Sequence, residues 1–146
     1  MSDAAGPPAL RAPTHQVSPR AVGYWRTTAL IWNVILVAIA TTVYFVVPER
    51  PWWATTLLAL LVVITATHVI AMPSIRYRVH RWEVSDIAVQ TLAGWIGRET
   101  RIAPLSRIQT VDSSQGALMR VFGLASLTVT TASAAGPITI SCLDAE

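Results

Sequence analysis

The sequence predicts two membrane-spanning helices followed by a small domain of antiparallel β-strands. Two stretches of 21 residues carry no charge, and only 13% of the 146 residues are charged. A soluble domain usually has about 25% charged residues, so part of this chain is expected to lie outside water. After Pro73 the pattern changes to roughly six short segments in which apolar and polar residues alternate, which is typical of strands.

The first segment, residues 1–23, contains four prolines and no hydrophobic periodicity. We expect a disordered cytoplasmic tail there. A two-helix transmembrane hairpin follows at 24–73, with helices at 27–47 and 52–72. Each helix holds 16 hydrophobic residues of 21 and would be about 31 Å long, close to the thickness of a bilayer core.

The turn between the helices is "PERP", residues 48–51. Two prolines break the helix there. A cleaved signal peptide is a poor alternative for the first helix, because 26 mostly polar residues precede it and its apolar run is too long.

Arginines flank the hairpin on one side. Three precede the first helix, three follow the second, and only one lies in the turn: Arg11, Arg20 and Arg26; Arg76, Arg78 and Arg81; Arg50. By the positive-inside rule, this predicts a multi-pass protein of the cell membrane with both termini in the cytoplasm. Arg76, Arg78 and Arg81 are candidate contacts for lipid head groups, although they could equally serve only to fix the topology.

The remaining residues, 74–146, predict a cytoplasmic β domain. Ile75, Tyr77 and Val79 alternate with polar residues, and a phase slip near Arg81 suggests a strand with a bulge. Further strands are expected at 87–92, 98–103, 106–112, 126–132 and 138–142, with a glycine-bounded turn at 94–97 and a short helix at 117–122. The alternation predicts that six side chains are buried: Trp82, Val89, Ile108, Phe122, Leu127 and Val129.

One stretch of this domain resembles a known family. It carries Pro104, "SRIQ" at 106–109, Val111, and Arg120 followed by "VFGLA" at 121–125. Residues 75–143 thereby resemble the bacterial pleckstrin-homology-like (PH-like) domain of YdbS-like membrane proteins. The resemblance implies a bent antiparallel sheet closed by a C-terminal helix. The chain ends at "LDAE", so the expected fold is a membrane helical hairpin plus an all-β PH-like domain whose C-terminal helix is largely missing.

The sequence offers no catalytic, cofactor or metal site. Its histidines, His15, His68 and His80, and its lone cysteine, Cys142, show no metal-ligand spacing, and no glycine-rich phosphate loop follows a strand. We therefore expect no enzyme and no small-molecule substrate, and the net charge of +3 is small for nucleic-acid binding. His68 and Asn33 lie at membrane depth; a hydrogen bond between the helices is favoured over a proton relay.

The polar segment "SRIQTVDSSQG" supports two interpretations. Its side chains are candidates for contacting a partner, together with one arginine further on: Arg107, Gln109, Asp112 and Arg120. The favoured alternative is a scaffold, in which Ile108 and Val111 pack inward and Arg107 pairs with a carboxylate such as Asp112 or Glu99.

The first functional hypothesis is a membrane-anchored, non-catalytic interaction or assembly module. The alternatives are a component of an envelope-stress or antimicrobial-resistance system, suggested by the resemblance, and a small transporter or channel subunit. The expected partners are the lipid bilayer and either another protein or further copies of this chain, docked on the face lined by Ile138 and Ile140.

Overall fold

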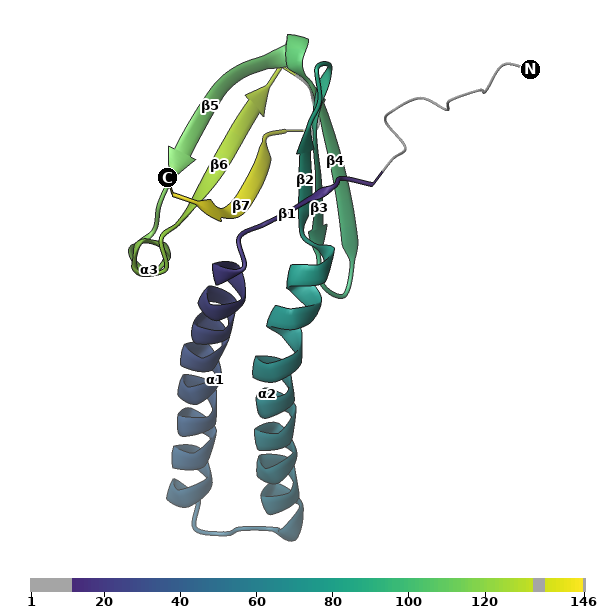
Figure 1. Cartoon of the computed structure of the whole chain (residues 1–146). Helices are drawn as coiled ribbons and strands as arrows, with labels where there is room; N and C mark the ends of the chain where they lie inside the picture. Colours follow the sequence, from purple (N-terminus) through teal and green to yellow (C-terminus); the bar gives the residue numbers. More distant parts are fainter. Residues whose placement is uncertain (1–11, 133–135, 146) are drawn as a thin grey trace, which may run out of the picture.

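The computed structural model describes residues 12–132 and 136–145. Two long antiparallel helices, α1 (Arg20–Val46) and α2 (Trp52–Val79), form a hairpin that carries the β domain at one end (Figure 1). In the most apolar 18-residue segment of each helix, only 6% and 11% of the residues are buried. A core helix of a soluble protein would be mostly buried, so these helix surfaces are suited to a bilayer.

Both helices are longer than expected. At about 1.5 Å per residue they extend roughly 40 Å, so each overhangs a bilayer core of about 30 Å by about two turns. The prediction that Ile75–Val79 form a strand is wrong, because α2 continues through Pro73 to Val79. The buried ring of Pro73 and the buried side chain of Val79 anchor this last part of the helix. The phase slip near Arg81 marks the end of the helix and not a bulge, since β2 pairs with β3 without interruption.

The prediction of a disordered tail is wrong for residues 12–23, while residues 1–11 lie outside the described part. β1 (His15–Gln16) pairs with β2, and α1 already begins at Arg20. Ser18 joins this segment to β7: its backbone N–H donates to Cys142 at 3.0 Å, and its Oγ donates to Asp144 at 2.7 Å. These tertiary hydrogen bonds order a segment whose composition alone suggests disorder.

The β domain contains two antiparallel sheets. One has the order β1-β2-β3-β4, with β2 (Arg81–Val84), β3 (Ala88–Gly94) and β4 (Arg98–Pro104). After the 3₁₀ turn η2 (Leu105–Arg107), the second sheet has the order β5-β6-β7. Its elements are β5 (Ile108–Ser114), the short helix α3 (Ala117–Val121), β6 (Leu124–Thr131) and β7 (Ile138–Asp144). The predicted hairpin plus antiparallel β domain is confirmed, and in the described residues the two sheets do not join into a closed barrel.

The hydrophobic core has one centre where the helices meet the sheets. It combines the overhanging helix ends with residues of β6 and β7: Val17, Ala21, Trp25, Ala29, Met72, Leu124 and Cys142. We call this the junction cluster. Of the six side chains expected to be buried, Val89 and Val129 are, whereas the other four are only half-buried: Trp82, Ile108, Phe122 and Leu127.

Ile138 and Ile140 are each only 4% exposed within the single chain. The face that they line is turned into the domain, where β7 packs toward β3 and β4. The prediction that this face is a docking surface is therefore wrong.

Candidate functional site

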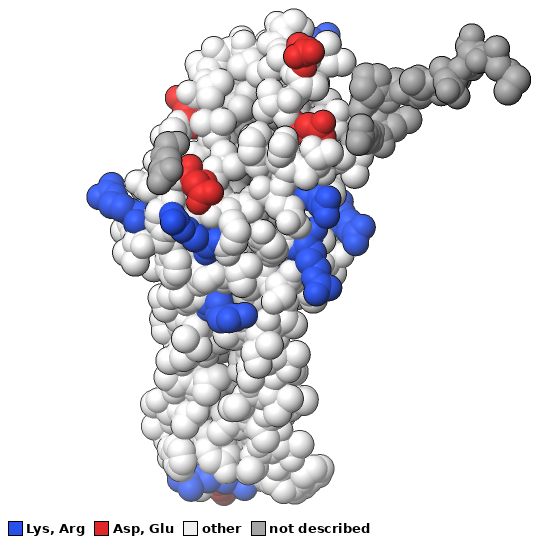
Figure 2. All heavy atoms as spheres, in the orientation of Figure 1, with Lys and Arg blue, Asp and Glu red and all other residues white. Residues whose placement is uncertain are grey.

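The candidate site lies at the end of the β domain that faces the helices. We call this end the base; it comprises residues 20–26, 73–81, 94–98 and 117–123. Blue arginine atoms gather there in Figure 2, whereas red carboxylates lie mostly higher on the β domain. The sequence places seven arginines in these segments: Arg20, Arg26, Arg76, Arg78, Arg81, Arg98 and Arg120. The base is thus a positively charged region at the start of the hairpin.

Arg76, Trp25 and His80 form the centre of the base. The guanidinium of Arg76 lies 4.6 Å from the centre of the Trp25 ring, and the His80 ring lies 5.0 Å from it. His80 Nδ1 is 2.9 Å from the carbonyl oxygen of Arg76. Burial and then the charge of Arg76 lower the pKa of His80, so its ring is neutral near pH 7. Within the described residues Arg76 forms no ion pair with a carboxylate; besides stacking on Trp25, its Nε donates to His80 Nε2 at 3.5 Å.

The β3–β4 turn descends beside α2. Gly94 has a φ of 137°, and a side chain there would meet the carbonyl oxygen of Gly97 at 1.8 Å, so the tight turn requires glycine. The Trp95 ring packs against His68 of α2, with ring centroids 5.5 Å apart. A hollow of about 590 Å³ lies behind the turn and is lined by Arg76, His80, Ala93, Gly94, Trp95, Gly97, Arg98 and Glu99.

The short helix α3 rests on α1 in the same way. Phe122 packs edge-on against Tyr24 at 6.2 Å, and a side chain at Gly23 would meet the Phe122 ring at 3.0 Å. Val121, at the end of α3, is 79% exposed. The β domain therefore contacts the hairpin through α3 on one side and through the β3–β4 turn on the other (Figure 1).

The four residues predicted to contact a partner do not form one surface. Arg107, Gln109 and Asp112 are exposed on η2 and β5, whereas Arg120 lies on α3 at the base. The seven residues of β5 separate Arg107 from α3 by about 23 Å at 3.3 Å per residue.

The scaffold alternative fails in its details. Glu99 bonds to Arg101 at 2.7 Å and Asp112 accepts from Thr110 at 3.3 Å, so neither of them pairs with Arg107. Val111, expected to pack inward, is 55% exposed.

The predicted lipid contacts lie together at the base. Arg76 and Arg81 are half-buried and Arg78 is exposed, across the end of α2 and the start of β2. Binding of lipid by these three residues stays a prediction. The predicted hydrogen bond between the helices is confirmed, because Asn33 Nδ2 lies 3.1 Å from His68 Nδ1.

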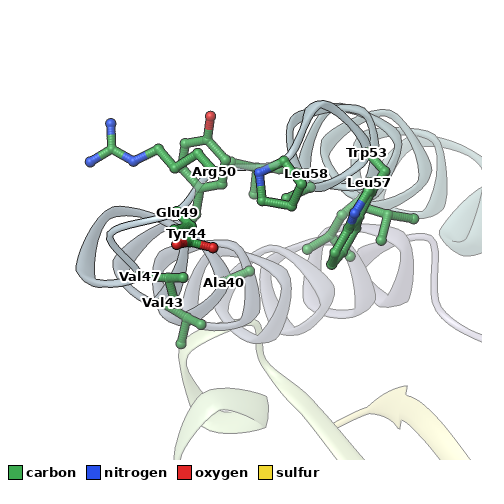
Figure 3. A pocket seen from close by; sticks show the side chains of 12 residues that line it. Ala40, Val43, Tyr44, Val47, Glu49, Arg50, Trp53, Leu57 and Leu58 are labelled. Carbon is green, nitrogen blue, oxygen red and sulfur yellow. The ribbon is translucent and has the colours of Figure 1, made fainter.

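A second hollow, of about 870 Å³, opens between α1 and α2 near their connecting turn (Figure 3). Its wall is mainly aliphatic and aromatic, with Tyr44, Trp53 and Leu57 among the side chains that line it. Glu49 and Arg50 are its only ionisable side chains apart from Tyr44. Because it opens on the apolar surface of the hairpin, lipid chains would fill it in a bilayer, and it offers no arrangement for catalysis.

In the described part of the chain, no three His, Cys, Asp or Glu side chains lie close enough to hold a metal ion. Cys142 is buried, and burial raises the pKa of its thiol to about 11. The thiol is therefore protonated at neutral pH and is a poor nucleophile.

Comparison with known proteins identifies the family. Residues 28–146, which include most of the hairpin, match the family described as "Bacterial PH domain". The chain belongs to the bacterial PH domain family. One relative is "UPF0699 transmembrane protein YdbS" of Bacillus subtilis (strain 168). The two sequences are 30% identical over 123 residues, and the alignment covers 82% of this chain and 77% of the relative. No solved structure gives a significant match. Because it has two apolar helices and a transmembrane relative, the chain is a membrane protein.

Proposed function

We propose that the chain is a membrane-anchored interaction module without enzymatic activity, in which the free edge of β5 pairs with a β-strand of a partner protein. The hairpin crosses the membrane twice and holds the β domain at one surface. The observation that carries the proposal is the exposure of β5, which has a neighbour in the sheet on one side only.

The arginine distribution supports a cytoplasmic location of the β domain. Arg20 and Arg26 begin α1, Arg76 and Arg78 end α2, and the turn between the helices holds only Arg50. Because arginines near membrane spans stay in the cytoplasm, the base and both termini lie there.

The edge of β5 has the properties of a docking strand. All its residues are exposed except Ile108, which is half-buried. Val111 lies opposite Val129 and so shares its face of the sheet, yet Val111 is 55% exposed and Val129 only 2%. An exposed edge strand offers backbone N–H and C=O groups to another strand, and a valine beside it offers apolar area. The membrane anchor concentrates such partners in two dimensions.

The test is the size of the complex extracted from native membranes with a mild detergent. Val111→Lys places a charge on the edge, which disfavours strand pairing, and should reduce the complex to the single chain. Ile87→Lys is the matched control, because Ile87 is 61% exposed in the β2–β3 turn, which belongs to the other sheet and not to the β5 edge. A single chain in the unmodified sample, or an unchanged complex in Val111→Lys, would contradict the proposal.

A further inference from the structure

The β3–β4 turn lies at a depth that the bilayer reaches. Trp52 begins α2 at the connecting turn, and tryptophan favours the membrane interface, so the hydrocarbon core starts close to it. At about 1.5 Å per residue, His68 lies about 24 Å further along α2, inside a core of about 30 Å. Because Trp95 packs against His68 at 5.5 Å, the turn extends to the boundary of the hydrocarbon.

The tip of the turn is apolar, and in the described part of the chain much of it is exposed. Ile96 is 81% exposed and Trp95 is 41% exposed. Such a pair suits the membrane interface, where the indole lies at head-group level and an aliphatic side chain leaves water. The obligatory glycine at 94 fixes the direction of this tip.

Behind the tip, the hollow of about 590 Å³ carries a net positive charge. Arg76 and Arg98 line it. Its one carboxylate, on Glu99, is neutralised by Arg101 at 2.7 Å. His80, also in the wall, is neutral because burial and Arg76 lower its pKa.

The depth of this charge matches that of lipid phosphates. Arg76 lies about 36 Å from Trp52 along α2, which is about 6 Å beyond the hydrocarbon core, at the level of the head groups. A partly buried charge is costly unless it is paired. The half-buried guanidinium of Arg76 has no carboxylate partner in the described residues, so a bound anion would stabilise it.

We propose that the β3–β4 turn inserts Ile96 and Trp95 into the leaflet, and that Arg76 and Arg98 bind the phosphate of an anionic phospholipid in the hollow behind it. The turn is then a third membrane anchor besides the two helices. This site lies apart from the β5 edge and functions independently of it.

Insertion is tested on the full chain in nanodiscs. A fluorophore is attached at Ile96→Cys or, as the matched control, at Ile87→Cys at the opposite end of β3. The buried Cys142, whose burial raises its thiol pKa to about 11, stays unlabelled. Nitroxide on lipid chains near the head group should quench the label at 96 several times more strongly than the label at 87. Equal, weak quenching at both positions would overturn the insertion.

Binding of the head group is tested with a nitroxide-labelled phosphatidylglycerol mixed into phosphatidylcholine. The label at 96 should be quenched more strongly by this lipid than by labelled phosphatidylcholine. Arg98→Gln should reduce the preference about fivefold, the effect expected for one arginine at a membrane surface. Arg98 is substituted and not Arg76, because Arg98 is exposed, whereas Arg76 also packs on Trp25 and its loss would disturb the fold. Arg107→Gln, exposed on η2 far from the base, should leave the preference unchanged.

A final arm separates lipid from free anion. Inorganic phosphate in large molar excess over the labelled lipid should not displace the labelled phosphatidylglycerol. Displacement would assign the hollow to a soluble phosphate compound and overturn the lipid assignment. An equal loss of preference in Arg98→Gln and Arg107→Gln would show only general surface attraction and would overturn the site.

Discussion

Leu124→Ala should loosen the β domain from the hairpin. Leu124 is 0% exposed and belongs to the junction cluster, with Ala21 and Trp25 of α1 and Cys142 of β7. The substitution removes about three methylene equivalents, or about 2.4 kcal/mol of transfer free energy. The cavity left between two helix ends and a sheet adds to this, so a total cost of about 3–4 kcal/mol is expected.

The cost can be measured by thermal unfolding of the detergent-solubilised chain, followed by tryptophan fluorescence. For a chain of this size about 3 kcal/mol corresponds to a fall in Tm of roughly 6–12 °C. Val121→Ala is the control, since Val121 is 79% exposed on α3, and should change the free energy of unfolding by less than about 0.5 kcal/mol in detergent. If Leu124→Ala and Val121→Ala shift Tm equally, the junction cluster does not hold the two parts together.

Three further predictions concern topology, pH and thiol chemistry. A reporter that is active only outside the cytoplasm should be silent after Glu146 and active within 48–51; the opposite pattern would reverse the orientation. Burial and Arg76 lower the pKa of His80 from 6.5, so the unfolded chain takes up the proton first and stability should fall as pH drops below about 6.5. His80→Gln should flatten the dependence of Tm on pH, and an unchanged slope would exclude His80 as its source. Cys142 should resist alkylation at pH 8 in the folded chain and react in denaturant, and rapid reaction in the folded chain would contradict its burial.

The hairpin could be predicted because its signal is local. Long uncharged stretches satisfy the length requirement of a bilayer whatever surrounds them. The strands from β3 to β7 were also predictable, since alternation and the glycines near their ends lie within short windows.

The sequence-based predictions failed where distant contacts override local rules. Pro73 suggested a helix end, but α2 passes through it, and both Pro73 and Val79 are buried by the tertiary fold. The segment around His15 and Ser18 suggested disorder, but β2 and β7 supply hydrogen bonds that only the fold brings near.

The base could be predicted only in part. The sequence identified Arg76, Arg78 and Arg81, and it placed a turn at 94–97. It gave no signal that Trp25 and Arg76, 51 positions apart, would stack, or that Trp95 would reach His68. Both contacts depend on how far each helix extends beyond the membrane. This length is set only when the β domain packs against the junction cluster.

The most direct test of the interaction module is site-specific photo-cross-linking in living cells. A photoreactive amino acid replaces Val111 on the free edge of β5, and Ile87 in the β2–β3 turn serves as the control position. Position 111 is expected to cross-link to a discrete protein partner or to a second copy of the chain, and position 87 is not. A chain that stays free of cross-links at 111, or that cross-links equally from 111 and 87, would contradict the assignment of β5 as the docking edge.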